Sequence, residues 1–349
     1  MKILCMYSDG GSVPVRTGWG RVFNYCGHEF RFWKPSEKSA FDAFSEYNPD
    51  IYLGTTFDLD NAQVKCIAAR PHMKVGLYAS AWGEYLKGLD HKKYPIVLVN
   101  EQEKARLEKL KKETGKPDFV HLHAHGHFLE GTMGGWREIG IKPVGILNAA
   151  DLFAFYRGQY RPELACDFTF VGGFWGYKGI NLSRMLFPMC HPDSGLNGKI
   201  FGYAKWPVHN YLGYIEEAVM KDLFVSATVC PNVSEPHSTD FPWSTDIVER
   251  PYKTISSGGF TISDYVPALR DIFPADEMPL ARTPKEMIEL VHHFVDKPEE
   301  RLPYMEKARA RVIAEHSYFQ RVAAFFWEFD LPEEAKKVAK AKERFLANG

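Results

Sequence analysis

The residues with the clearest chemical character lie in residues 246–264, DIVERPYKTISSGGFTISD. They are Arg250, Tyr252, Lys253, Gly258 and Gly259. Cations and exposed amides at a helix mouth suit phosphate, a tyrosine ring suits a flat partner, and paired glycines let a ligand approach the backbone because they lack Cβ. The stretch therefore predicts a pocket for a phosphorylated ligand that carries a ring. A helix C-cap before a buried strand, with both cations solvated, explains the same pattern.

A second chemically informative stretch is ACDFTFVGGFWGYKGINLSRMLFPM. It predicts a strand that runs directly into Gly172 and Gly173, followed by a helix a few residues later. Lys178 lies between the glycine turn and the expected helix, INLSRMLF. An ordinary strand-to-helix turn, with Lys178 in water, is the alternative.

The N-terminus combines an apolar run, a glycine-rich loop and a helix. The run KILCMY is followed by SDGGSVPVRTGWG and then by RVFNYC, which is how a Rossmann-like domain begins. The glycine spacing is not G-x-G-x-x-G, so no dinucleotide fingerprint is present. The candidate cleft residues of this loop are Gly10, Gly11, Arg16 and Gly18. A flexible surface loop is the alternative.

One acidic residue follows the expected strand KVGLYAS. Ligands gather beyond the carboxyl ends of strands in open parallel sheets, so Ser80, Trp82 and Glu84 should lie near a ligand. Glu84 is the nearest ionisable side chain and is a candidate catalytic residue. An exposed loop glutamate without a role is the alternative.

Four histidines alternate in PDFVHLHAHGHF. On a continuous strand His121, His123, His125 and His127 would share one face, which suggests zinc. Because alternate residues on a strand are about 7 Å apart, three of them converge on one ion only if the chain bends, for example at Gly126. The other hypotheses are a contact between His125 or His127 and the substrate, with His125 as a catalytic candidate, and structural histidines.

Composition narrows the class of protein. The chain has 349 residues, 45% of them hydrophobic and 25% charged, which is enough for two cores. The formal net charge of −1 gives no overall field for nucleic acid or anionic membrane. The six cysteines form no C-x-x-C pair, and no signal peptide or membrane-length apolar run is evident. We expect a soluble cytoplasmic protein with reduced thiols.

The order of strands and helices predicts an α/β protein with two domains. Residues 1–160 form the first expected domain, residues 161–320 the second, and residues 321–349 are helices that return to the first. The linker is expected in RGQYRPE, which is polar and lacks periodicity.

Three motifs give the chain a resemblance to a known family. ERPYKTISSGGFTISD is similar to the "R, aromatic, E, four residues, G-G-F, two residues, D" segment of glycosyltransferases of the GT-B fold, especially the CgeB-like branch of glycosyl transferases group 1. FVGG with a basic residue five to seven positions on, and HSYFQR, resemble two further motifs of that group. Lys253 stands where the family usually has a glutamate that holds the donor ribose, and lysine cannot accept a hydrogen bond.

The resemblance implies two facing Rossmann-like domains with parallel sheets, and a nucleotide-diphosphate sugar such as a UDP-sugar as co-substrate. Its donor site would comprise Gly172, Gly173, Lys178, Glu235, Arg250, Tyr252, Lys253, Gly258 and Gly259. Gly10, Gly11, Arg16 and Gly18 would lie near the donor phosphate or the acceptor.

The resemblance also implies transfer without a cofactor or resident metal, with retention of anomeric configuration. The acceptor could be a glycan, a small molecule or modified DNA. A relative that binds nucleotide or sugar without turnover, and a histidine-metal hydrolase, are the competing functions.

Overall fold

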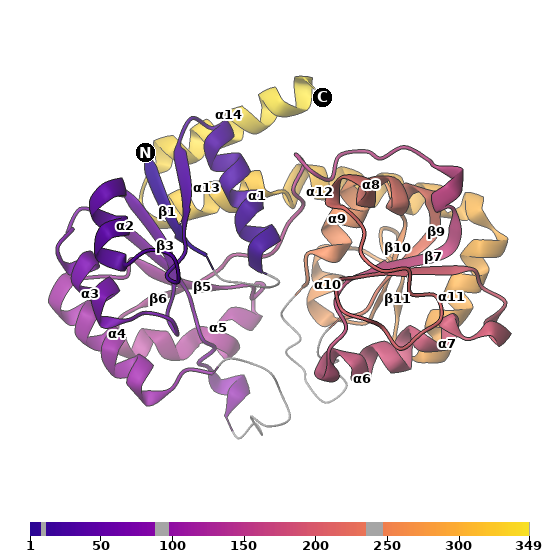
Figure 1. Cartoon of the computed structure of the whole chain (residues 1–349), viewed down its shortest axis with the longest axis horizontal. Coiled ribbons are helices and arrows are strands. Elements are labelled where there is room, and N and C mark those ends of the chain that lie inside the picture. Colours follow the sequence, from indigo (N-terminus) through magenta and orange to yellow (C-terminus); the bar gives the residue numbers. More distant parts are fainter. Residues whose placement is uncertain (8–11, 88–97, 235–246, 349) are drawn as a thin grey trace. The chain divides into compact units, whose positions relative to one another are not determined.

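The computed structural model describes residues 1–7, 12–87, 98–234 and 247–348, which divide into two compact units (Figure 1). Unit 1 comprises Met1–Leu147 and Tyr318–Gly349, and unit 2 comprises Asn148–Ser317. Residues 318–349, near the C-terminus, thus belong to the first unit. Residues 148–160, assigned to the first domain from sequence, make contacts within unit 2: the amide of Gly158 donates to Ser257 O at 2.9 Å.

Unit 1 is built on a parallel sheet with the strand order β2-β1-β3-β4-β5-β6. The strands are β1 (Lys2–Met6), β2 (Glu29–Trp33), β3 (Ile51–Thr55), β4 (Lys74–Tyr78), β5 (Phe119–Leu122) and β6 (Lys142–Gly145). Parallel strands need crossover connections, so helices cover both faces of the sheet. The order reverses between β1 and β3, where doubly wound folds place a ligand crevice.

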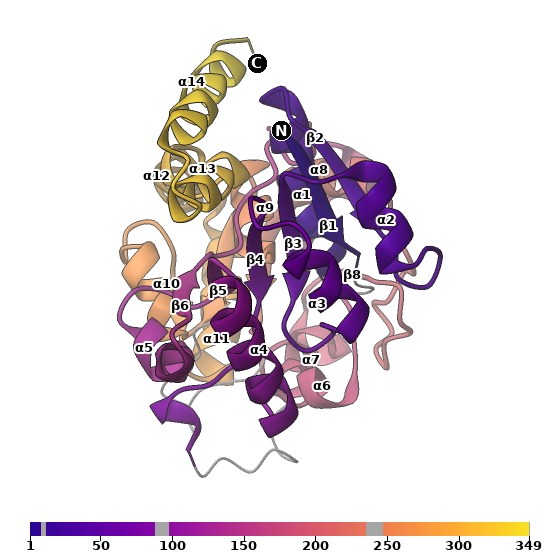
Figure 2. The same ribbon diagram turned by 90° about the vertical axis from the view of Figure 1, so that its left-hand side faces the viewer.

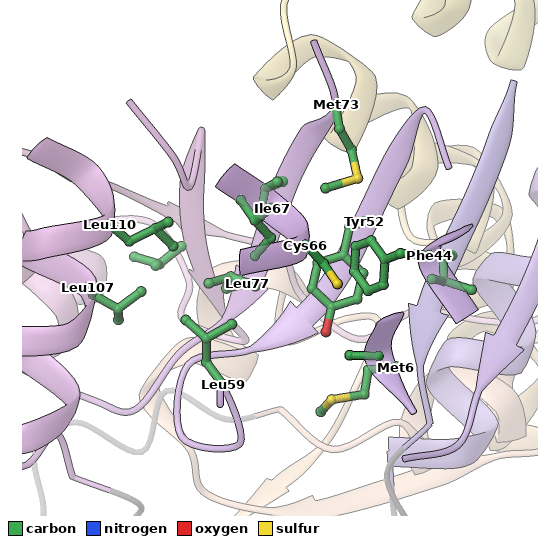
Figure 3. Packing of buried hydrophobic residues seen from close by; sticks show 14 of the residues in the cluster. Met6, Phe44, Tyr52, Leu59, Cys66, Ile67, Met73, Leu77, Leu107 and Leu110 are labelled. Carbon is green, nitrogen blue, oxygen red and sulfur yellow. The ribbon is translucent and has the colours of Figure 1, made fainter. Parts of the chain in front are cut away.

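One face of this sheet packs against α2 (Ala40–Tyr47), α3 (Asn61–Ala68) and α4 (Glu101–Thr114), which Figure 2 shows along the same side of the strands. Their apolar residues form one cluster with alternate residues of the strands, and Figure 3 shows its centre around Tyr52 and Leu77. Side chains on the other face of β1 and β5 belong to a different layer because strand residues alternate in direction.

The other face packs against α1 (Ser12–Tyr25) and α13 (Tyr318–Glu328), with α14 (Pro332–Asn348) packed on α13. Phe325 of α13 is fully buried, with its ring centroid 4.9 Å from that of Trp19 in α1 and 6.2 Å from that of Phe119 in β5. The C-terminal helices therefore supply, together with α1, the apolar cover of this face of the first sheet.

Unit 2 contains a second parallel sheet, with the order β11-β10-β9-β7-β8. The strands are β7 (Cys166–Val171), β8 (Gly198–Phe201), β9 (Ala227–Asn232), β10 (Thr261–Asp264) and β11 (Leu280–Ala281). The order reverses between β7 and β9, and doubly wound folds bind ligands at the carboxyl ends of two such strands. We call this region of unit 2 the crevice.

The helices of unit 2 connect and cover these strands. They are α6 (Gly176–Met185), α7 (Phe187–Cys190), α8 (Glu217–Ser226), α9 (Arg250–Ser256), α10 (Pro267–Ile272), α11 (Pro284–Asp296) and α12 (Leu302–Glu315), while α5 (Phe128–Met133) belongs to unit 1. α11 begins with a capping box: Glu286 N donates to Thr283 Oγ1 at 3.1 Å and Arg282 N to Glu286 Oε2 at 2.6 Å.

Within the described ranges, the helices are too short or too polar for any of them to cross a membrane.

Candidate functional site

Arg250 joins the two strand ends at which the order of the second sheet reverses. Its Nε donates to the carbonyl oxygen of Val171 at the end of β7, at 3.0 Å, and its Nη1 donates to Oδ1 of Asn232 at the end of β9, at 2.9 Å. Arg250 is the first residue of α9, so the helix start brings its guanidinium to the crevice. A permanent positive charge therefore lies at the position where doubly wound sheets bind ligands.

Lys178 lies beside the same strand end. The Arg250 guanidinium is 4.2 Å and the Lys178 ammonium 5.9 Å from the centroid of the Phe170 ring in β7. Both cations are largely buried, at 9% and 5% exposed. Two cations on one ring next to helix-end amides form a setting that suits a diphosphate.

Glycine is required at position 172. A Cβ built on Gly172 would lie 2.8 Å from Nη2 of Arg250 and 3.0 Å from the Phe170 ring. A side chain there would crowd the guanidinium and the Phe170 ring, so glycine suits this position. The group that lies closest to Gly172 in this structure is thus the guanidinium of Arg250.

The loop after β7 is held by buried aromatic rings. The Trp206 indole donates to Gly172 O at 3.1 Å, and its ring centroid is 5.3 Å from those of Phe170 and Phe174. Gly173 is packed against Trp175, because a Cβ built on it would lie 2.6 Å from that ring. This packing fixes the loop that leads into α6 and its Lys178.

Asp264, at the end of β10, organises the neighbouring loop. Its carboxylate accepts hydrogen bonds from Ser234 N at 3.0 Å, Ser234 Oγ at 2.9 Å and Asn181 Nδ2 at 2.9 Å. Ser263 Oγ, which accepts from Asn232 Nδ2 at 2.8 Å, connects this network to the partner of Arg250. A buried carboxylate with several donors is strongly held, so the crevice is preorganised.

Two other predicted residues of α9 lie away from the crevice or serve the helix itself. Tyr252 is fully buried, with its ring centroid 6.0 Å from that of Phe273 and 5.7 Å from that of His316, so it packs inside the unit and offers no face to a base. The Lys253 ammonium is 3.5 Å from Oε2 of Glu249 and 5.3 Å from the Phe155 ring centroid. Lys253 thus forms an ion pair within the same helix.

Gly258 and Gly259 lie at the opposite edge of the sheet from Arg250. They follow the C-terminus of α9 and precede β10, and Gly258 has a φ of +89°. A Cβ on Gly259 would lie 2.8 Å from Phe224 O in α8. The pair therefore forms a helix C-cap and a packing point, as in the alternative interpretation. Because β10 begins just after them, they lie at the amino ends of the parallel strands, whereas Arg250 lies at the carboxyl ends. Glu235 lies outside the described residues.

The predicted cleft loop of unit 1 gives two structural residues. Arg16 is 5% exposed, and its Nη1 donates to the carbonyl oxygen of Met6 at the end of β1. Gly18 allows α1 to pack on α13, since a Cβ there would lie 2.2 Å from the Tyr318 ring. Gly10 and Gly11 lie outside the described residues.

The two catalytic candidates of unit 1 follow neighbouring strands. Glu84 opens a short 3-10 helix, Glu84–Leu86, after β4, and its Oε1 is 2.5 Å from Lys87 Nζ with both side chains 73% exposed. His125 is partly buried and follows β5, which ends at Leu122. Both lie beyond carboxyl ends of the sheet.

The four histidines do not share one face, because β5 ends at Leu122, before the second of them. His121 is buried among the rings of Trp19, Tyr78 and Phe325, and burial holds its pKa well below the ordinary value. His123 Nδ1 is 2.7 Å from Ile146 O. Over the residues that the structure describes, no three His, Cys, Asp or Glu side chains are grouped to hold a metal ion.

Sequence reasoning gave no role to several residues that shape the crevice: Asn181, Asn232, Ser234 and Asp264. Polar residues at strand ends were the available signal. Their hydrogen-bond partners come from segments up to 83 positions apart, as in the Asn181–Asp264 bond, so these pairings could not be predicted from local sequence.

Residues 183–326 match a family model described as glycosyl transferase-like. The match begins in α6 and ends in α13, so it covers most of unit 2. It confirms the predicted resemblance to glycosyltransferases and does not single out the CgeB-like branch. Among curated proteins, no sequence matches the chain.

Solved structures of glycosyltransferases are similar to this chain over nearly its full length. Sucrose-phosphate synthase from Thermosynechococcus elongatus has a TM-score of 0.59 and 12% identity, with 100% of both chains covered. T4 phage BGT in complex with UDP-glucose has a TM-score of 0.57 and 16% identity, covering 95% of this chain and 100% of that one.

A third similar structure is Anabaena HepE in complex with UDP and glucose, with a TM-score of 0.58 and 8% identity, covering 95% of this chain and 99% of that one. These likenesses confirm the predicted α/β fold, with two Rossmann-like domains of the GT-B kind. At such identities they establish the fold alone.

Proposed function

We propose that the protein transfers a sugar from a nucleotide-diphosphate sugar, a UDP-sugar in the first instance, to an acceptor hydroxyl. The observation that carries this proposal is the pair of buried cations, Arg250 and Lys178, at the reversal point of the second sheet. The glycosyl transferase-like match over residues 183–326 and the UDP complexes of BGT and HepE support it.

Charge development explains how this site would promote transfer. The bond between the anomeric carbon and the diphosphate oxygen breaks, and its electron pair leaves with the diphosphate. A new bond forms from the acceptor oxygen to the anomeric carbon, and the proton of the acceptor hydroxyl passes to the leaving diphosphate. Arg250, Lys178 and the amides at the start of α6 offset the negative charge that grows on the leaving group.

This reaction requires no resident metal, because the protein's own cations supply the charge. We propose retention of configuration on the family resemblance. We further propose that Glu84 and His125 of unit 1 contact the acceptor or the transferred sugar. The acceptor class, glycan, small molecule or modified DNA, is taken up below.

Thermal denaturation with nucleotides tests the donor assignment. A ligand that binds only the native state stabilises it, by about 2.7 kcal/mol at a hundred times its Kd. The melting temperature therefore rises. We expect UDP and UDP-glucose to raise the melting temperature of the wild type, and Lys178→Ala to abolish that rise.

Arg250 is tested with a conservative variant, because an alanine would leave Val171 O and Asn232 Oδ1 without their hydrogen-bond donors. Each unsatisfied acceptor would lower the folding stability by about 1–3 kcal/mol. Arg250→Lys keeps the charge and loses the planar fork, so we expect a reduced rise with UDP. Lys205→Ala is the matched control, since this exposed lysine follows β8. If UDP raised the melting temperature of both Lys178→Ala and Arg250→Lys as much as that of the wild type, the assignment of these two residues to the donor site would be refuted.

Turnover separates an enzyme from a relative that only binds nucleotide. Release of UDP from UDP-glucose, with water or an added acceptor, supports transfer. UDP binding without any turnover across a panel of donors and acceptors would favour the binding-only alternative.

A further inference from the structure

We propose that three exposed aromatic residues of unit 2, Trp175, Tyr203 and Tyr214, form a binding strip for a carbohydrate chain beside the diphosphate site. We call them the aromatic row. The inference rests on the proposed function and narrows its acceptor to a glycan. It follows from where the three rings lie on the sheet and from which neighbouring rings are buried.

Each ring follows the carboxyl end of an adjacent parallel stretch. Trp175 follows β7, and Tyr203 follows β8, which pairs with β7 through Val171 and Phe201. Residues 210–213 continue the sheet beyond β8: Leu212 N donates to Ile200 O and Gly202 N to Gly213 O, both at 2.9 Å. Tyr214 follows this third stretch. Because neighbouring strands are about 4.8 Å apart, the three positions span about 10 Å of one sheet edge.

The first two rings are neighbours. A Cβ built on Gly173 would lie 2.6 Å from the Trp175 ring and 3.7 Å from the Tyr203 ring, so the glycine lies between them. Exposed fractions are 45% for Trp175, 75% for Tyr203 and 59% for Tyr214. A gathering of large exposed rings on one edge, unlike a single one, indicates a binding surface.

The loops that carry the row are anchored by different aromatic residues. Phe174 packs against Phe187 and Trp206, with ring centroids 5.8 and 5.3 Å apart, and Trp206 is 2% exposed. Stability of the loops is therefore supplied by Phe174 and Trp206. Trp175 also packs on Gly173, but with 45% of its surface exposed it leaves ring area open to a ligand, as Tyr203 does at 75%.

The row begins at the diphosphate site. The Lys178 ammonium is 4.6 Å from the centroid of the Trp175 ring and 5.9 Å from that of Phe170, over which the Arg250 guanidinium also lies. A chain bound along the row would thus have one end beside the cations that hold the donor. That is the placement an acceptor glycan needs.

The openness of the row favours a sugar chain over a nucleobase. A base site encloses the flat ring and places fixed polar groups at its edge. Here the rings are open to solvent and spread over three loops, which suits the apolar CH faces of successive sugar rings. Tyrosine and tryptophan combine an apolar face with a polar edge that also bonds hydroxyl groups.

Binding of neutral hexasaccharides to the full chain tests the proposal. The probes are maltohexaose, cellohexaose and chitohexaose, measured by calorimetry with UDP binding as a parallel readout. We expect at least one to bind saturably, and Tyr203→Ala and Tyr214→Ala each to raise its Kd at least tenfold. Tyr203→Phe keeps the ring and should stay within twofold of wild type. Tyr160→Ala is the matched control, a 62% exposed tyrosine of the same unit away from the row.

The outcomes separate this proposal from the donor assignment. Failure of all three probes to bind, or an unchanged Kd in Tyr203→Ala, overturns the aromatic row. A tenfold loss of UDP affinity in Tyr203→Ala would also overturn it, since the ring would then contact the base. Glycan binding that depends on Tyr203 in a protein that does not bind UDP supports the row and rejects the proposed function instead.

Discussion

At the scale of single residues, the candidate site depends on charged groups taken out of water. Arg250 and Asp264 are 9% and 5% exposed, and both are held by hydrogen bonds to strand ends. Burying a charge is costly unless it is well hydrogen-bonded, so a protein keeps such groups when they serve a ligand or fix a loop. Asp264 fixes the loop at Ser234, and we propose that Arg250 serves a ligand.

Unit 1 contains another buried carboxyl, Glu103 of α4, which is 3% exposed. Burial raises the pKa of this group above its ordinary value, although hydrogen bonds from Thr56 and Ser80 oppose the rise. Ser80 Oγ donates to its Oε2 at 2.9 Å. The protonated form is therefore favoured in the folded state relative to the unfolded chain.

Glu103→Gln tests this assignment through pH. A carboxyl whose pKa is raised on folding contributes stability below its unfolded pKa and loses it as pH rises through the folded pKa. The amide does not titrate. We expect the melting temperature of Glu103→Gln, relative to wild type, to increase from pH 4 to pH 8.

The control for this comparison is Glu108→Gln on the exposed side of α4, which should show no such trend. A difference between Glu103→Gln and wild type that is constant over the pH range would contradict the raised pKa.

At the scale of elements, the course of α9 explains why the two ends of the motif ERPYKTISSGGF have different roles. Its first residue, Arg250, reaches the carboxyl ends of β7 and β9, while its C-terminus meets the start of β10 at the other edge. A helix between two parallel strands must run from one edge of the sheet to the other. The motif ERPYKTISSGGF therefore spans the sheet, and only its beginning lies at the site.

Gly258→Ala tests whether the C-terminal end of α9 is a helix cap and not part of the donor site. Gly258 has a φ of +89°, where an alanine costs about 1–2 kcal/mol, although a Cβ would meet nothing closer than 3.7 Å. We expect a lower midpoint in urea denaturation and an unchanged rise of the melting temperature with UDP. Gly27→Ala in unit 1 is the matched control, because Gly27 has a φ of +83° and open space around it. Loss of the UDP effect in Gly258→Ala alone would restore the glycine to the donor site.

At the scale of the whole molecule, the chain builds each sheet's cover from segments distant in sequence. Helices α13 and α14 complete unit 1, although they follow the whole of unit 2 in the sequence. Phe325 packs against Trp19, Phe119 and His121, so the last helices belong to the first core.

Phe325→Ala should therefore weaken unit 1 specifically. Truncating a buried phenylalanine costs about 3–5 kcal/mol. Differential scanning calorimetry should show one transition at a lower temperature and a second that keeps its rise with UDP. Phe294→Ala, which removes a buried ring of α11 in unit 2, is the mirror control. Equal displacement of both transitions by Phe325→Ala would show that the two units unfold together.

The sequence by itself determined the class of fold, because short apolar runs alternate with helices along both halves of the chain, and this order predicts parallel sheets. It also singled out Gly172, Lys178 and Arg250, which the structure brings to the same strand ends and which we propose as part of the phosphate site. Only the tertiary structure decided that Tyr252 is buried, that Gly258 and Gly259 cap a helix at the far edge, and that Trp175, Tyr203 and Tyr214 share one edge. The reason is that a residue's type and local spacing follow from the sequence, whereas the edge of the sheet it reaches depends on strands that pair across long separations.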